Sequence, residues 1–492
     1  MESASSPQVF PPRRVAVIGG GISGLAAAHR LKELAPQIEL VLFERAERLG
    51  GVLWTVHEHG YQIEQSADNF ITTVPWGVAL CKRLGMVDQL VQTNPAHRRT
   101  FVVRKGKLYR LPDGFLMMAP TQMWPLAVTP LLSPVGKLRA ACEYFLPRRK
   151  DSRDESMAAF VRRRLGKEVF ERLVEPLVSG VYAADMEKLS VLATLPRFRE
   201  MEREHGSLIR AMRKQMASRR SPQGESGARY SMFVTLRDGL SSLIDALAAR
   251  LPPDSVRLNT SVERIERVSD SWKIYSDRAA AESFDGLIVA TPSHVAARLL
   301  EPTDAELGRR LAEVQHEGTA ILTVAYRREQ IRHPLDGMGF VVPGIEGSPI
   351  LAGSFSSQKY THRAPEGMEL IRVFVGGARR PEMAEMDERE LKPLVLGELN
   401  QLLGIEGEPV YARVAHWPRT MPQYHVGHGG LVECIERLAG ALPGLALAGN
   451  AYYGVGIPTC IHSGEQAAER LVKGIAQNPI AQPSLRGSEP PK

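Results

Sequence analysis

The sequence predicts an α/β fold in which one nucleotide-binding domain is assembled from separated segments, with other domains inserted between them. Short apolar β-type runs occur near the start, in the middle and near the end of the chain, and two of them lead through a glycine-rich turn into a helix pattern. The 492 residues are too many for one hydrophobic core. A content of 43% hydrophobic and 24% charged residues is typical of a globular protein.

The first element is a strand, turn, helix and strand over residues 13–44. Its turn contains Gly19, Gly21 and Gly24 in the pattern G-x-G-x-x-G. The first glycine permits the tight turn, the second lets a pyrophosphate approach the backbone, and the third lets helix and strand pack closely. Glu44 ends the second strand about 20 residues later, where a carboxylate accepts hydrogen bonds from a ribose diol and repels a 2′-phosphate. The segment therefore predicts a Rossmann-type dinucleotide site and disfavours NADP.

The sequence after Glu44 favours FAD over NAD. "ERAERLGG" brings Gly50 and Gly51 to the same ligand. The chain has no second G-x-G-x-x-G for a nicotinamide cofactor and no C-x-x-x-x-C pair of a disulfide reductase. A tightly held FAD, reduced by the substrate and reoxidised by a small acceptor, is the simpler interpretation.

The character changes between the α/β segments. Residues 101–215 have helical spacing, and prolines 120, 125, 130 and 134 exclude a regular membrane-spanning helix. This part either dips into one membrane leaflet, anchored by Trp124 and neighbouring arginines, or forms a helical wall around a cavity. Residues 316–415 return to strand-type runs and predict an antiparallel-sheet domain.

Charge and cysteine content restrict the function classes. A formal charge of +7 fits anionic ligands, an acidic membrane surface or an ordinary soluble enzyme. No basic stripe with interleaved aromatic residues occurs, so we predict no nucleic-acid partner. The four cysteines lie far apart without metal-ligand spacing, which predicts no metal, reduced thiols and a cytoplasmic protein. The first dozen residues lack the apolar run of a signal peptide.

Five motifs carry a family resemblance. They are "GGGISGL", "ERLGG", "LVEPLVSGVYAAD", "WPRTMPQYHVGH" and "AGNAYYGVGIPTCIHSG". In this order they resemble the oxygen-dependent, FAD-containing porphyrinogen oxidases of heme biosynthesis, within the amine-oxidase-like flavoprotein superfamily, from about Val15 to Leu471. The resemblance implies an FAD-binding domain (12–83, 230–295 and 430–475), a substrate-binding domain (84–100 and 296–429), and a helical, membrane-associated domain (101–229). Residues 1–11 and 476–492 are expected to be flexible tails.

The resemblance also implies roles for individual residues. Those expected at the cofactor are Gly19, Gly20, Gly21, Ile22, Ser23, Gly24, Glu44, Arg45, Arg48, Gly51, Val52, Ala67, Asp68, Asn69, Val262, Trp417, Asn450, Val455, Gly456 and Ile457. Those expected at the substrate are Arg98, Arg99, Gly180, Val341, Leu351 and Phe374. The segment "QSADNF" departs from the Gly-Pro pair usual in the family, and Thr100 stands where the family often has a propionate-binding arginine, so either Arg98 or Arg99 takes that part.

The implied reaction is the six-electron oxidation of protoporphyrinogen IX to protoporphyrin IX, in which three dioxygen molecules become three hydrogen peroxides. The flavin performs the chemistry, and no catalytic side chain is assigned. Coproporphyrinogen III, with four propionates, stays open as the substrate, as do an amine oxidase activity and a non-catalytic binding protein of the same fold. The expected location is the cytoplasm, with peripheral contact at the inner face of the cell membrane; a homodimer stays open.

Overall fold

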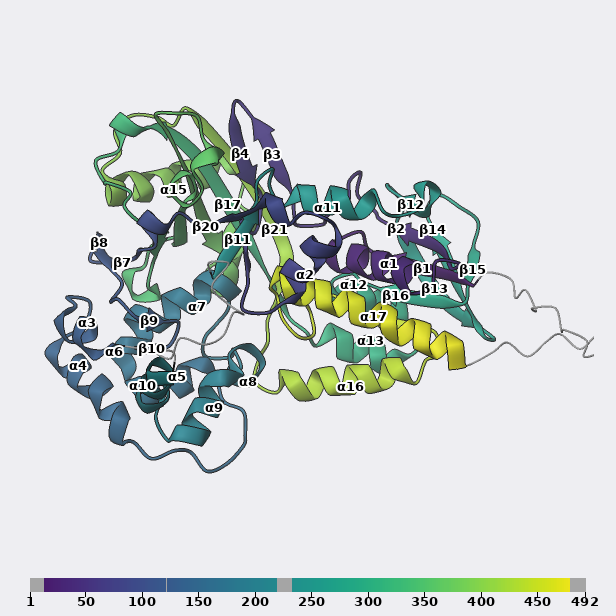
Figure 1. Ribbon diagram of the computed structural model, residues 1–492, viewed down its shortest axis with the longest axis horizontal. Helices are drawn as coiled ribbons and strands as arrows, with labels where there is room; N and C mark the ends of the chain where they lie inside the picture. Colours follow the sequence, from purple (N-terminus) through teal and green to yellow (C-terminus); the bar gives the residue numbers. More distant parts are fainter. Residues whose placement is uncertain (1–12, 121, 219–231, 478–492) are drawn as a thin grey trace, which may run out of the picture.

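The computed structural model describes residues 13–120, 122–218 and 232–477. The described chain forms a nucleotide-binding part, a part built on a large sheet, and a helical part (Figure 1). Within these ranges no helix is long and apolar enough to cross a membrane. The tails expected at residues 1–11 and 476–492 lie outside the described residues, except that the last helix extends to Gln477.

The nucleotide-binding part is organised around a five-stranded parallel sheet. Its order is β12 (Val256–Arg257), β2 (Glu39–Phe43), β1 (Arg14–Ile18), β16 (Gly286–Val289) and β22 (Leu445–Leu447). These strands come from the beginning, middle and end of the chain, so one sheet is assembled from separated segments. Apolar residues fill β1, β2 and β16 almost continuously because both faces of the sheet are covered.

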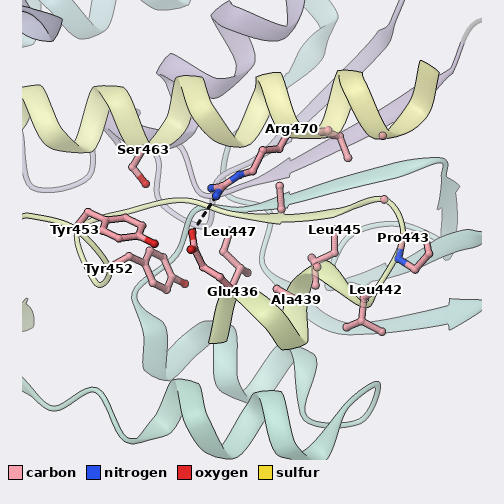
Figure 2. Close-up of a pocket in the computed structure, with 15 residues that line it drawn as sticks. Glu436, Ala439, Leu442, Pro443, Leu445, Leu447, Tyr452, Tyr453, Ser463 and Arg470 are labelled. Carbon is pink, nitrogen blue, oxygen red and sulfur yellow. Dashed lines mark hydrogen bonds and ion pairs between the residues drawn. The ribbon is translucent and has the colours of Figure 1, made fainter. Parts of the chain in front are cut away.

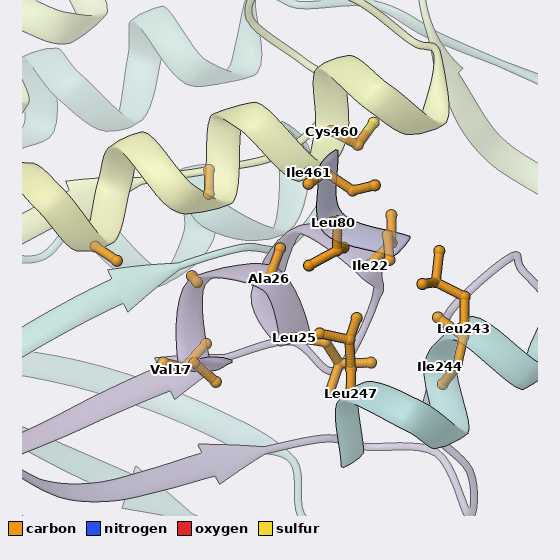
Figure 3. Close-up of a cluster of buried hydrophobic side chains, with 14 of the residues drawn as sticks. Val17, Ile22, Leu25, Ala26, Leu80, Leu243, Ile244, Leu247, Cys460 and Ile461 are labelled. Atoms are coloured by element: carbon orange, nitrogen blue, oxygen red, sulfur yellow. The ribbon is translucent and has the colours of Figure 1, made fainter. Parts of the chain in front are cut away.

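Two different layers cover this sheet. One face carries the helices α1 (Ile22–Leu34), α2 (Trp76–Arg83), α11 (Ser241–Ala248) and α17 (Ile457–Gln477). Their side chains form the cluster in Figure 3, which includes Leu25, Leu80, Leu247 and Ile461. The other face carries α12 (Ser293–Leu300), α13 (Ala305–Ala312), α16 (His428–Gly440) and the antiparallel strands β13 (Val262–Val268), β14 (Ser271–Ser276) and β15 (Glu282–Phe284).

Two small sheets join this part to the rest of the molecule. The first is the hairpin β3 (Thr55–Glu58) and β4 (Tyr61–Glu64). The second has the order β5 (Phe70–Ile71), β11 (Phe233–Leu236) and β6 (Leu90–Gln92). Ile63 of β4 packs with Ala325 and Leu370 of the large sheet, and Phe70 of β5 packs in the core of the nucleotide-binding part, so the segment between them connects the two parts.

The large sheet is mixed rather than purely antiparallel. Its order is β21 (Tyr411–Pro422), β17 (His316–Arg327), β20 (Met368–Gly376), β19 (Ile350–Phe355), β18 (Gly339–Val341), β7 (Thr100–Arg104) and β8 (Lys107–Arg110). The strands β17 to β21 pair antiparallel, as predicted for residues 316–415, whereas β7, which was not expected in this sheet, runs parallel to β18. The helices α14 (Ser356–Lys359) and α15 (Glu388–Leu403) accompany this sheet.

Residues 101–110, expected in the helical domain, instead extend the large sheet as β7 and β8. Lys105 and Gly106 have φ values of 50° and 68°, so the chain reverses in a two-residue hairpin turn. The β-type residues "FVV" and "LY" on the two sides of "KG" were the available signal.

The helical part follows this hairpin. It contains α3 (Met123–Val128), α4 (Pro134–Ala141), α5 (Met157–Leu165), α6 (Lys167–Val169), α7 (Glu175–Tyr182), α8 (Val191–Thr194), α9 (Pro196–His205) and α10 (Leu208–Ser218), with a short ribbon of β9 (Phe115–Leu116) and β10 (Ala119–Pro120). Its core continues onto the large sheet through Val102, Val341 and Ala352. The helical part therefore forms a wall against that sheet.

Candidate cofactor and substrate site

The turn between β1 and α1 needs glycine at two positions for the protein's own packing. Gly19 has φ +105°, and a Cβ there would lie 2.8 Å from the carbonyl oxygen of Ala290. A Cβ at Gly24 would overlap the carbonyl oxygen of Gly19. These glycines let helix and strand approach, as the sequence predicted.

Gly21 has a different environment. It is the N-cap residue of α1, with extended backbone angles that any residue can adopt, and no side chain caps this helix end. A Cβ at Gly21 would meet no atom within 4 Å. The uncapped amides of the first helical turn and the empty space beside Gly21 therefore fit a bound phosphate group.

Glu44 holds the turn together. The amide nitrogens of Gly20 and Ala46 donate to its carboxylate at 2.7 and 2.8 Å. The amide of Gly50 donates to the carbonyl oxygen of Gly20 at 2.8 Å, which brings the "LGG" loop against the turn. Each carboxylate oxygen of Glu44 keeps a second lone pair with which it could accept a ribose hydroxyl.

A cavity of about 780 Å³ opens over this turn. Nine of the residues predicted at the cofactor line it: Gly19, Gly21, Glu44, Arg45, Arg48, Gly51, Val52, Val262 and Trp417. They come from the two ends of the chain and from β13, so folding brings together residues nearly 400 positions apart. The size of the cavity is in the range of sites for large cofactors.

Other lining residues were missed by sequence reasoning. They are contributed by α12, by the loop before it and by the end of β21, and they include Thr291, His294, Arg298, His416 and Arg419. Two buried polar atoms, Thr291 Oγ1 and His294 Nδ1, have no hydrogen-bond partner within the described residues. These atoms can serve a polar ligand. No local motif marked them, because they meet the glycine turn only after folding.

The rim of this cavity is positively charged. Arg45, Arg298 and Arg419 are exposed at the cavity, and none forms a hydrogen bond or ion pair within the described ranges. Burial lowers the pKa of His294, and these three arginines lower it further. The cavity mouth therefore attracts anions.

Trp417, in the cavity wall, contacts the chain just before residues 67–69, which were predicted to bind the cofactor. The indole Nε1 of Trp417 donates to the carbonyl oxygen of Gln65 at 2.6 Å. Asp68 does not line the cavity; it is buried and accepts from Lys359 Nζ at 2.9 Å. Asn450 donates to the carbonyl oxygen of Thr420 at 3.2 Å, which joins the loop before α17 to the same wall.

Four predicted residues from different parts of the chain share one apolar cluster. Val341 and Ala352 are paired on neighbouring strands, and Ala352 is paired with Phe374. A Cβ at Gly180 of α7 would lie 3.8 Å from Val341 Cγ1 and 3.9 Å from Ala352 Cβ. Val455, just before α17, belongs to the same cluster. Leu351, the sixth expected substrate residue, is buried at the irregular point of β19.

The two arginines expected to bind a substrate carboxylate lie elsewhere. Arg98 and Arg99 are both exposed. Arg99 Nη1 lies 3.0 Å from Asp336 Oδ2, and Arg110 shares the same carboxylate at 2.9 Å. Arg99 is thus already engaged in an ion pair, in which it shares Asp336 with Arg110.

A second, smaller cavity lies on the other side of the loop that contains Asn450. It measures about 250 Å³ and is bounded by α16, β22 and α17. Figure 2 shows Glu436 of α16 and Arg470 of α17 meeting across it, and their ion pair measures 2.9 Å. Tyr452 and Tyr453 of the loop form its inner end. Residues of the loop line this cavity, and the cavity shares no lining residue with the cofactor cavity.

The described residues contain no group of three or more histidine, cysteine or acidic side chains arranged to hold a metal. All four cysteines are free thiols. Burial raises the pKa values of Cys81 and Cys460 to about 12, so neither is a reactive thiolate.

Comparison with known proteins gives the family. The profile of the flavin containing amine oxidoreductases matches residues 22–472. The chain belongs to this family. It is an FAD-dependent oxidoreductase, which agrees with the uncapped helix end, the space beside Gly21 and the unpartnered polar atoms of the cavity.

Individual flavoproteins resemble the chain over nearly its whole length. Coproporphyrinogen III oxidase of Bacillus subtilis is 35% identical, with 92% of this chain and 97% of the relative covered. Mitochondrial protoporphyrinogen oxidase of Nicotiana tabacum is 29% identical, with 96% and 97% covered. A solved structure from Exiguobacterium sp. 255-15, provisionally described as a protoporphyrinogen oxidase, is 30% identical, covers 93% of this chain and 98% of its own, and has a TM-score of 0.84.

Proposed function

We propose that this flavoprotein oxidises a porphyrinogen to the porphyrin with dioxygen as acceptor, and that coproporphyrinogen III is its preferred substrate. The observation that carries the proposal is the chain-long similarity to the Bacillus enzyme named for that substrate. Protoporphyrinogen IX, the substrate expected from sequence alone, is the second candidate because the tobacco relative is named for it at lower identity.

In this proposal the glycine turn and the cavity hold FAD. The amides at the start of α1 receive the pyrophosphate beside Gly21, and Glu44 accepts the ribose hydroxyls while it fixes Gly20. The backbone of Val262 would meet the adenine, and Arg45 and Arg48, which also line the cavity, would place positive charge near the phosphates. Asn450 and the "GVGIP" loop, which begins α17, approach the other end of the cofactor.

The apolar cluster around Val341 and Phe374 forms the substrate side. A porphyrinogen is a large, mostly apolar ring, so a wall of Gly180, Val341, Phe374 and Val455 binds its faces and excludes water. Bound FAD supplies the hydride acceptor. The residues of the chain contribute orientation, and no side chain at this wall carries a proton that the reaction requires.

Turnover assays with both porphyrinogens test the substrate. Purified holoenzyme is given each compound in air, and porphyrin fluorescence and peroxide are followed. We expect faster oxidation of coproporphyrinogen III; exclusive oxidation of protoporphyrinogen IX would reverse the choice. Rapid oxidation of amines without any porphyrin formation would replace the proposal by an amine oxidase.

A matched pair of variants tests the substrate wall. Gly180→Leu places a side chain against Val341 and Ala352, whereas Gly397→Leu adds the same side chain on α15, where a Cβ meets nothing within 4 Å. We expect Gly180→Leu to lose at least tenfold in kcat/KM while retaining its flavin, and Gly397→Leu to keep its activity. Equal activity of both variants would place the substrate elsewhere.

We also propose that the outer face of the helical part binds a membrane surface. Five large apolar side chains there are more than half exposed: Trp124, Val128, Val135, Leu138 and Phe145. They lie on α3, α4 and the turn that follows, at the end of the helical part farthest from α1 (Figure 1). Lys137, Arg148 and Lys150 add positive charge in the same stretch.

Vesicle flotation tests this surface. Transfer of one such side chain into lipid stabilises binding by about 1.5–3 kcal/mol, so Leu138→Ser with Phe145→Ser should weaken partition into phosphatidylcholine–phosphatidylglycerol vesicles by roughly 100-fold to 10⁴-fold. Val410→Ser removes another exposed apolar side chain, outside the helical part, and is the control. Unchanged flotation of the double variant would contradict membrane binding by this face.

A further inference from the structure

A buried cluster of charged side chains lies between the cofactor cavity and the apolar substrate wall. It consists of Glu64, Asp68, Lys359, Arg363 and Arg372, and it is called the interior charge cluster below. Glu64, Arg363 and Arg372 are each at most 1% exposed, and the side chains of Asp68 and Lys359 are 11% and 12% exposed. Burial of each charge costs several kcal/mol of desolvation free energy. The arrangement of the partners therefore decides how much of this cost is offset.

The cluster touches the wall of the cofactor cavity. Arg372 Nη2 donates to the carbonyl oxygen of Ser66, and the neighbouring carbonyl oxygen of Gln65 accepts from Trp417, which lines the cavity. On its other side, the guanidinium carbon of Arg372 lies 5.1 Å from the ring centre of Phe374. Arg372 is therefore connected to the cavity wall through Ser66, Gln65 and Trp417, and it lies beside Phe374 of the substrate wall.

The cluster has more cations than anions. Lys359 Nζ is 2.9 Å from Asp68 Oδ2, and Arg372 Nη1 is 3.6 Å from the same oxygen. Arg363 Nη2 is 3.5 Å from Glu64 Oε1 and donates to the carbonyl oxygen of Asp68 at 3.0 Å. Three cations thus face two carboxylates. Burial raises the pKa of Glu64, which weakens the negative side further.

No neighbouring group removes the surplus. Glu369, also on β20, is held by Ser357, Gln358 and Arg328 and is therefore already engaged. The Nε and Nη1 atoms of both Arg363 and Arg372 have no hydrogen-bond partner among the described residues. Each such buried, unsatisfied donor costs about 1–3 kcal/mol.

We infer that Lys359 and Arg372 are positioning residues whose surplus positive charge favours the reduced form of the bound flavin. The inference rests on the FAD site of the proposed function but not on the identity of the porphyrinogen. Hydride transfer adds two electrons and one proton to the flavin, so the flavin gains one net negative charge. The substrate loses that hydride and releases a second proton to water. A nearby uncompensated cation stabilises the charge that develops on the flavin.

Charge variants test the inference through the flavin midpoint potential and through sulfite affinity, neither of which involves a porphyrinogen. We expect Arg372→Gln and Lys359→Met to bind sulfite at least tenfold more weakly and to lower the two-electron potential by about 30 mV, the equivalent of a tenfold change. Asp68→Asn removes a negative charge and should shift both quantities in the opposite direction. General damage to the fold cannot produce opposite shifts.

Two controls complete the design. Arg372→Lys keeps the charge and should stay within about threefold of the wild type in sulfite affinity, as should Arg332→Gln, which removes an exposed cation outside the cluster. If Arg372→Gln does not retain FAD, Lys359→Met and Asp68→Asn carry the comparison.

The outcomes separate this inference from the proposed function. Unchanged potentials, or shifts of the same sign for Asp68→Asn and Lys359→Met, would overturn the inference. A higher KM for the porphyrinogen at an unchanged potential would also overturn it, because the cluster would then bind a substrate carboxylate. Opposite shifts in a protein that oxidises neither porphyrinogen would keep the inference and overturn the proposed substrate.

Discussion

Replacement of Gly21 by valine should abolish FAD binding and leave the protein folded. A Cβ at this position meets no protein atom within 4 Å, and φ −70° with ψ 175° suits a β-branched residue. The cost to the free energy of unfolding should therefore be below about 1 kcal/mol. Gly24→Val provides the contrast, since its side chain would overlap the carbonyl oxygen of Gly19 and destabilise the apoprotein by more than about 1–3 kcal/mol.

The loss of cofactor affinity follows from the uncapped end of α1. The valine methyl groups would occupy the space that a pyrophosphate needs in order to reach the amides of the first turn. Two charge-assisted hydrogen bonds at about 1.5–3 kcal/mol each would be lost, which corresponds to a Kd raised by roughly 100-fold to 10⁴-fold. Gly21→Ala, with one carbon, should show a smaller effect.

Flavin fluorescence quenching on titration of apoprotein measures the Kd, and urea denaturation of the same preparations measures stability. The expected pattern is a stable Gly21→Val protein that does not take up FAD and a destabilised Gly24→Val protein. A Gly21→Val protein that binds FAD with a Kd within threefold of the wild type would refute the placement of the pyrophosphate. A clash between the valine methyl groups and the pyrophosphate would necessarily raise that Kd.

Three further measurements address the rim, the pH response and the core. Arg298→Glu with Arg419→Glu should slow FAD association at least tenfold at low salt and much less at 0.5 M salt in stopped-flow experiments, because steering by rim charges is screened; a salt-independent effect would contradict steering. Burial lowers the pKa of the His316 imidazole to about 4, so the unfolded chain binds a proton at this residue more readily than the folded chain. The free energy of unfolding should therefore fall by about 1.4 kcal/mol per pH unit as the pH decreases from 6.5 to 4. His316→Asn should reduce this slope, and an unchanged slope would assign it to other groups. Leu25→Ala in the fully buried cluster of Figure 3 should cost about 2–5 kcal/mol in urea denaturation, and a loss below 1 kcal/mol would show that the site collapses around the cavity.

The part of the site that could be predicted from sequence is the part that is local. The strand, turn and helix around Gly19–Gly24 carry their own periodicity and glycine spacing, and Glu44 follows at a fixed distance along the next strand. The motif of that turn lies within about 30 residues, so the pattern alone predicts both the local fold and the ligand class.

The rest depends on contacts between distant segments. Lys359 and its partner Asp68 are 291 residues apart, and Arg298 and Glu44 line the same cavity only in the folded chain. No periodicity marks such residues. The family resemblance predicts Asp68 at the cofactor. In the structure its carboxylate is buried and paired with Lys359, so this ion pair fixes the segment 67–69. The hairpin at Lys105 was not predicted because the long apolar and helical stretch that follows it led residues 101–110 to be assigned to the helical domain.

The substrate wall illustrates why the fold alone does not determine the substrate. Gly180 comes from the helical part, Val341 and Phe374 from the large sheet, and Val455 from the loop just before α17. A change in the helical part can therefore reshape the space opposite the flavin without altering the glycine turn or the strands beneath it. In the proposed enzyme, the absence of a side chain at Gly180 leaves room for a wide ring against the sheet. A chain of the same family with a larger residue there would retain the redox site and accept only a narrower substrate.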